Sequence, residues 1–148
     1  MKKGDRPPPP PSLASQIGYS LIAKKTVQDR LHDAREFLQV GKEEIDKGRS
    51  IADKRMVREG SEKVFHALVE AAAARIQKYG LGIPESHDEI REGLYIAGPR
   101  ELLDTWDNVF SRLHAISYYR GWLDYEKIDE AVKEVESAIE RIGKLVGK

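Results

Sequence analysis

Apolar residues recur every three or four positions along most of this chain, the spacing expected when one face of an α-helix is buried. The first part of the chain carries two such stripes, made by Leu13, Ile17 and Leu21 and then by Val27, Leu31, Ala34, Leu38 and Ile45. Gly41 and Gly48 are expected to weaken the end of this helical segment, so residues 48–53 are interpreted as a connection. A second helix is predicted for residues 52–79, where the run Ala71–Ala74 would allow another helix to approach closely.

Three further helices are predicted in the second half. Ser86 and Glu89 match a capping box, so a third helix is expected from there to about Gly98. Pro99 suits the first turn of a fourth helix. The buried stripe of that helix is expected to be Leu102, Trp106, Val109, Phe110, Leu113 and Ile116. After an interruption at Gly121, Asp124 is expected to cap a fifth helix. Its apolar seam is nearly as regular as that of a coiled coil: Ile128, Val132, Val135, Ile139, Ile142 and Val146.

No alternating strand pattern competes with these helices, so the sequence predicts an all-α, up-and-down bundle of about four to five helices. Residues 1–11 include five consecutive prolines and are interpreted as a flexible proline-rich tail, and residues 12–148 as a single helical-bundle domain. The chain has no cysteine, which excludes disulfides, zinc–thiolate sites, iron–sulfur clusters and cysteine nucleophiles. It also shows no apolar run long enough for a membrane span and no secretory leader. A cytoplasmic protein without a membrane partner is therefore expected.

Residues 112–122 are the stretch that most resembles a functional site, because aromatic, basic and imidazole side chains gather at a predicted helix end. The candidate functional residues are Arg112, His114, Tyr118 and Arg120. An imidazole can move protons near neutral pH, and tyrosine rings can stack on bases while a guanidinium contacts phosphate. The sequence favours simpler interpretations, in which His114 is packed and hydrogen-bonded and the aromatic residues close the helix end over the core or over a dimer contact.

A basic segment offers a second candidate site, with Lys47, Arg49, Lys54, Arg55 and Arg58 as possible phosphate-binding residues. Its interspersed acidic residues favour a solvated turn instead. The whole chain has 25 basic and 25 acidic residues, so no overall field draws it to nucleic acid. The four histidines are scattered in the sequence, and no metal site or cofactor is expected. No glycine-rich phosphate loop, catalytic triad or dinucleotide fingerprint is recognised.

The order of these segments resembles the HEPN superfamily. The resemblance is carried by a long helix ending in Lys47-Gly48, a second helix containing the stretch from Gly60 to Leu68 and an alanine-rich end, a short helix opened by Ser86-His87, and the stretch from Leu113 to Asp124 before a terminal helix. Within the superfamily the sequence is most similar to the archaeal PaREP paralogous family, over roughly residues 25–146. The resemblance implies an up-and-down bundle, a homodimer, and relatives that are metal-independent ribonucleases.

In the active members of that superfamily, an arginine and a histidine separated by four to six residues form the cleavage site near the dimer interface. Counted from Arg112, these positions hold Ser117, Tyr118 and Tyr119. His114 comes only two residues after Arg112, so the two side chains point to nearly opposite sides of a helix. The chain is therefore expected to be a non-catalytic dimeric module that binds a protein, nucleotide or RNA partner. The alternative is a degenerate or rearranged ribonuclease, in which Arg112 or Arg120 of one subunit meets His114 or Tyr118 of the other.

Overall fold

A computed structural model describes residues 25–147 as a bundle of helices. The elements are α2 (Val27–Ser50), α3 (Lys54–Tyr79), α4 (His87–Ala97), α5 (Arg100–Val109), the π-helix η1 (Phe110–Tyr119) and α6 (Tyr125–Val146). No strand occurs in this range, so the predicted all-α bundle of about five helices is confirmed. The proline-rich tail and the stripe from Leu13 to Leu21 lie outside the described residues. No helix within 25–147 is long and apolar enough to cross a membrane.

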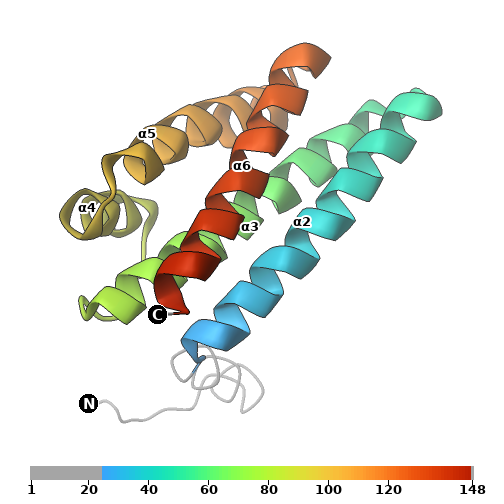
Figure 1. The fold of residues 1–148 in the computed structure, drawn as a ribbon. Helices are drawn as coiled ribbons and strands as arrows, with labels where there is room; N and C mark the ends of the chain where they lie inside the picture. The colour runs from blue at the N-terminus through green and yellow to red at the C-terminus, as the bar shows by residue number, and fades with distance from the viewer. Residues whose placement is uncertain (1–24, 148) are drawn as a thin grey trace, which may run out of the picture.

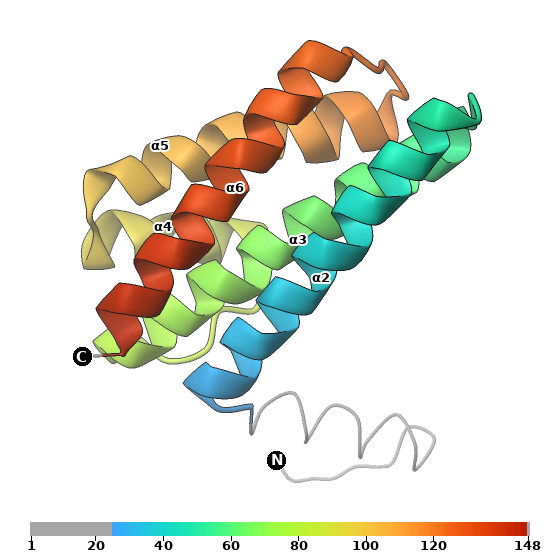
Figure 2. The same ribbon diagram turned by 45° about the vertical axis from the view of Figure 1, so that its right-hand side comes forward.

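Helix α3 is the centre of the bundle, because it packs against α2, α4, η1 and α6. Helices α2 and α3 form a long antiparallel hairpin (Figure 1). Helix α6 packs on this hairpin and also contacts α5 and η1. In both views the end of α6 lies at the same end of the bundle as the start of α2 (Figures 1 and 2).

Several helices begin at the polar residues that the sequence pattern selects. The carboxylate of Asp124 accepts a hydrogen bond from the Lys127 N–H at 3.1 Å, which confirms the predicted cap of α6. The Ser86 hydroxyl accepts from the Glu89 N–H at 3.1 Å, so half of the predicted capping box is present. The Glu89 carboxylate accepts from the backbone N–H of Glu85 at 2.9 Å, rather than from that of Ser86.

The expectation that Gly41 and Gly48 weaken the first helix is wrong. Helix α2 continues through both residues to Ser50, and both are buried against α3. A Cβ atom at Gly41 would lie 2.8 Å from the carbonyl oxygen of Gly60, and one at Gly48 would lie 2.7 Å from a methyl carbon of Val57. These glycines therefore let the two helix backbones approach closely, which offsets the helix propensity that they lack.

The regular seam of α6 is part of the core of this chain. All six predicted seam residues are buried: Ile128, Val132, Val135, Ile139, Ile142 and Val146. The run Ala71–Ala74 of α3 is also buried, which agrees with the expected close approach of another helix. Packing within the chain thus accounts for the regularity of the seam without a second copy.

The fourth predicted helix changes its hydrogen bonding halfway along. Helix α5 ends at Val109, and residues Phe110–Tyr119 continue as the π-helix η1, whose bonding pattern runs from an N–H to the carbonyl five residues earlier, as from Arg120 to Ala115 at 3.2 Å. Leu113 is buried as expected, whereas Phe110 and Ile116 are half-buried and Ser117 is buried instead. The wider turn brings residues four and five apart onto one face, so the ring of His114 lies between those of Phe110 and Tyr119, at centroid distances of 5.1 and 4.9 Å.

Candidate functional site

The end of η1 is anchored to α3 by Arg58. Its Nε and Nη2 atoms donate hydrogen bonds to the carbonyl oxygen of Tyr118, at 3.1 and 2.7 Å. These bonds satisfy a carbonyl that a helix end leaves without an intrahelical donor. Gly121 follows with a φ of 70°, a conformation that glycine adopts without strain, and the chain turns there towards α6. Arg58, a candidate phosphate ligand in the sequence, thus has a role in holding the fold.

His114 is held by a carboxylate and by a ring. Its Nδ1 atom lies 2.8 Å from Oε1 of Glu62 on α3. Because a carboxylate only accepts hydrogen bonds, Nδ1 carries the proton in this contact, which selects the tautomer of the neutral ring. The ring also stacks on Phe65 with centroids 4.7 Å apart. The side chain is 13% exposed, so His114 is packed and hydrogen-bonded within its own chain.

Two more histidines lie beside this pair. Nε2 of His66 is 3.6 Å from Oε2 of Glu62, and the ring of His87 meets that of His114 edge-on at 5.2 Å between centroids. We call Glu62, His66, His87 and His114 the histidine cluster. Partial burial lowers the pKa of His87, and the neighbouring charge of His114 lowers it further. Three of the four histidines, scattered in the sequence, are therefore gathered by α3, α4 and η1.

Glu62, His66 and His87 were not predicted from the sequence to belong to one site. The local signal was the spacing of four between Glu62 and His66, which places both on one face of a helix. Among residues 25–147, no group of three or more histidine, aspartate and glutamate side chains could hold a metal ion. The surroundings of the cluster are mostly aromatic, since Phe65 contacts the rings of both His87 and His114. Proton transfer and hydrogen bonding are the chemistry that this arrangement offers.

Arg112 and Ser117 take no part in the polar contacts of the histidine cluster. Within residues 25–147, the half-buried Arg112 makes no hydrogen bond or ion pair. Ser117 is the first of the three sequence positions considered above for a histidine, and within the same residues its fully buried side chain has no hydrogen-bond partner for Oγ. The described chain therefore does not join Arg112 to an imidazole.

Three of the five basic candidates around the α2–α3 turn have polar partners within residues 25–147. Arg49 donates to both carboxylate oxygens of Asp129 on α6, at 2.8 and 3.0 Å. Arg55 pairs with Glu59 on its own helix at 3.2 Å, and Arg58 is occupied by the end of η1. Lys47 and Lys54 are exposed.

A hollow of about 310 Å³ opens beside the histidine cluster. It is lined by Arg55, Arg58, Glu59, Tyr118 and Tyr119. Tyr118 is half-buried and stacks on His114 with centroids 6.4 Å apart. The hollow thus combines two guanidinium groups with two tyrosine rings, and one carboxylate opposes their charge.

The aromatic side chains at the end of η1 extend into solvent. Tyr119 and Trp122 are each 68% exposed, and Arg120 between them is exposed too. Tyr119 and Trp122 therefore do not close the helix end over the core of this chain, and the other part of the interpretation, that they cover a dimer contact, stays a prediction. We call Arg55, Tyr118, Tyr119, Arg120 and Trp122 the η1 surface. Comparison with known protein families, with curated proteins and with solved structures finds no match for this chain.

Proposed function

We propose that the chain is a non-catalytic, HEPN-like helical module that binds single-stranded RNA through the η1 surface. The observation that carries the proposal is the exposure of Tyr119 and Trp122 beside arginine side chains. Exposed aromatic rings next to guanidinium groups suit a ligand that offers both flat bases and phosphates. Stacking contributes about 1–3 kcal/mol per base and tolerates most sequences. The chain has no net charge and the η1 surface has two arginines, so binding is expected to be weak and to fall further as salt is added.

The positions of Ser117 and His114 support the proposal that the chain does not cleave RNA. The histidine position of the superfamily motif holds a serine whose hydroxyl is buried. His114, the nearest imidazole in sequence, is directed to Glu62 on α3 and makes no polar contact with Arg112. A phosphodiester at Arg112 would therefore lack a proton-transferring partner from the same chain.

Homodimerisation is part of the proposal and rests on the HEPN resemblance. The α6 seam adds no separate support, because all of its residues are buried within the chain. Sedimentation velocity at micromolar concentration is the direct measurement. A species of twice the 16.8 kDa chain mass is expected, and a single species at the chain mass would contradict the dimer.

Trp122 makes the binding proposal easy to test by fluorescence. The only other tryptophan, Trp106, is 2% exposed, so quenching by an added oligonucleotide reports on Trp122. We expect a single-stranded oligoribonucleotide to quench this emission at low salt, and Tyr119→Ala to weaken binding by about five- to a hundredfold, the loss of one stacked base. Tyr95→Ala is the matched control, because Tyr95 is equally exposed but lies on α4. Equal binding by both variants, or no binding at all, would overturn the proposal.

A rearranged ribonuclease is the second candidate, favoured by the contact between Glu62 and His114. A carboxylate that binds Nδ1 orients an imidazole so that Nε2 can accept a proton, as in other acid–base dyads. Cleavage of structured and single-stranded RNA should then fall at least a hundredfold in His114→Ala and less in Glu62→Gln. Cleavage that His114→Ala leaves unchanged would point to contamination or to another site.

A further inference from the structure

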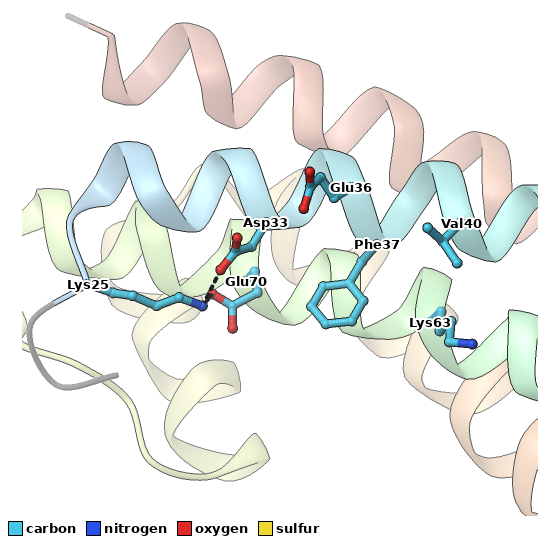
Figure 3. Close-up of a pocket in the computed structure, with 7 residues that line it drawn as sticks. All are labelled: Lys25, Asp33, Glu36, Phe37, Val40, Lys63 and Glu70. Atoms are coloured by element: carbon cyan, nitrogen blue, oxygen red, sulfur yellow. Dashed lines mark hydrogen bonds and ion pairs between the residues drawn. The ribbon is translucent and has the colours of Figure 1, made fainter. Parts of the chain in front are cut away.

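A second hollow runs between α2 and α3. It has a volume of about 430 Å³ and is lined by Lys25, Asp33, Glu36, Phe37, Val40, Lys63 and Glu70 (Figure 3). Phe37 and Val40 project from α2 on the side facing α3 and are 37% and 42% exposed. We call this hollow the α2–α3 groove. Its centre is apolar and its rim is charged, which is typical of a site for an amphipathic segment.

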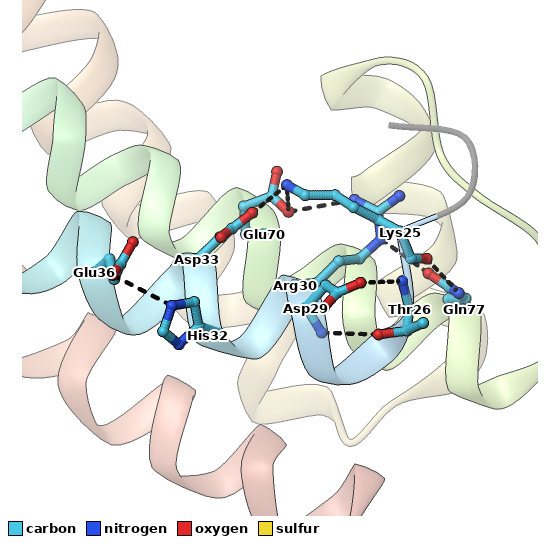
Figure 4. A network of polar contacts seen from close by, with 9 residues as sticks. All are labelled: Lys25, Thr26, Asp29, Arg30, His32, Asp33, Glu36, Glu70 and Gln77. Carbon is cyan, nitrogen blue, oxygen red and sulfur yellow. Dashed lines mark hydrogen bonds and ion pairs between the residues drawn. The ribbon is translucent and has the colours of Figure 1, made fainter. Parts of the chain in front are cut away.

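The chain enters α2 at one end of this groove, where a polar network fixes it. The ammonium group of Lys25 reaches along the groove and pairs with Glu70 at 3.1 Å and with Asp33 (Figure 4). The side-chain amide of Gln77 on α3 donates to the backbone carbonyl of Lys25 at 3.1 Å. Arg30 binds the same glutamine at 2.8 Å. Lys25, the first described residue, is thus held at the mouth of the groove.

The sequence before Lys25 has the composition that an apolar groove requires. Residues 12–23 contain no charged side chain, in a chain that is 34% charged overall. Leu13, Ile17 and Leu21 follow one another at a spacing of four, which would place them on one face of a helix. Leaving such a face in water would cost free energy, because burying a leucine or isoleucine side chain is favourable.

We propose that residues 12–24 fold back along α2 and cover the α2–α3 groove of the same chain. Leu13 lies as many residues before Lys25 as Phe37 lies after it, so a helical segment that turns near Lys24 brings Leu13 to the level of Phe37. The tether at Lys25 gives the segment a high effective concentration at the groove, which favours it over a separate molecule. This surface is then an internal interface, and the η1 surface remains the site for a partner.

The absence of cysteine makes this proposal testable by cross-linking in the full-length chain. We expect the double variant Leu13→Cys/Val40→Cys to give an intramolecular product with a short bismaleimide, at a rate at least fivefold above that of Leu13→Cys/Ile51→Cys. Ile51 is a matched control, because it is 55% exposed and lies just beyond the other end of α2. Equal rates would overturn the proposal. So would products of twice the chain mass alone, which would assign the groove to a second copy.

Hydrogen exchange of the unsubstituted chain gives a test that is independent of the cysteine variants. We expect the amides of residues 13–23 to be protected, and Phe37→Asp to remove that protection while the amides of α6 stay protected. Fast exchange of residues 13–23 in the unsubstituted chain would overturn the proposal. Protection that survives in Phe37→Asp would also overturn it, because the segment would then be ordered without the groove.

Discussion

Gly41 on α2 and Gly60 on α3 face each other so closely that a Cβ atom added to either would lie 2.8 Å from the carbonyl oxygen of the other. The backbone cannot yield at this point without separating the two longest helices of the described chain. We expect Gly41→Ala to lower the free energy of unfolding by about 1–3 kcal/mol, because the overpacking outweighs the gain in helix propensity. Urea unfolding monitored by circular dichroism measures the change.

Gly143→Ala is the control for the glycine prediction. Gly143 also lies within a helix, but a Cβ atom there would meet only the end of the Arg35 side chain, at 3.0 Å. A flexible guanidinium can move aside, so this variant is expected to be neutral or slightly more stable. The close-approach argument fails if Gly41→Ala is as stable as Gly143→Ala.

The contact between His114 and Glu62 joins η1 to α3, so the two residues should contribute to stability as a pair. Both side chains are mostly buried, with exposed fractions of 13% and 16%. In a double-mutant cycle with His114→Phe and Glu62→Gln, we expect a coupling free energy of about 0.5–3 kcal/mol. The phenyl ring retains the stacking on Phe65, and glutamine retains an acceptor oxygen, so the coupling reports on the part of the contact that depends on the carboxylate.

The ion pair between His32 and Glu36 provides the comparison for this cycle. It joins side chains that are 71% and 67% exposed on a single helix, and water screens such a pair. The corresponding variants should show no measurable coupling. Equal coupling at both pairs would mean that the contact of His114 with Glu62 does not hold η1 on α3.

His87 should make the fold less stable in mild acid. Its pKa in the folded chain is below the ordinary value of 6.5, because of partial burial and the charge of His114. The unfolded chain therefore binds a proton more readily, and stability present above pH 6.5 is lost as the pH falls towards the folded pKa. His66 also opposes the charge of His87, whereas Glu62 and Asp88 favour it.

The variant His87→Gln separates this contribution from those of the other histidines. Between about pH 7.5 and about pH 5.5, we expect the urea midpoint of the unsubstituted chain to fall further than that of His87→Gln. If the two midpoints fall in parallel, His87 is not the source of the acid sensitivity.

The elements that depend on local pattern could be predicted from the sequence. Asp124 caps α6 because its carboxylate needs only the N–H of Lys127, three residues away. The buried face of α6 follows from the spacing of its apolar residues. The effect of the glycines of α2 was predicted wrongly. These residues permit a close contact with α3, and no local pattern in the sequence reveals that contact.

The site could be predicted only in part for the same reason. Residues 112–122 were recognised by composition, but the wide turn of η1 depends on how its rings pack against α3. The histidine cluster joins Glu62 to His87 and His114, which lie 25 or more positions away along the chain. The arrangement of three helices brings these residues together, and their spacing along the sequence does not predict it.

Ser117 carries a buried hydroxyl that has no hydrogen-bond partner among residues 25–147. An unsatisfied buried polar group costs about 1–3 kcal/mol, so Ser117→Ala should raise the free energy of unfolding by about 1 kcal/mol. Ser61→Ala is the control, since Ser61 is equally buried but its hydroxyl donates to the carbonyl oxygen of Val57 at 2.9 Å. That variant is expected to be neutral or less stable. A loss of stability in Ser117→Ala would contradict the prediction and would indicate that the hydroxyl contributes a hydrogen bond to the fold.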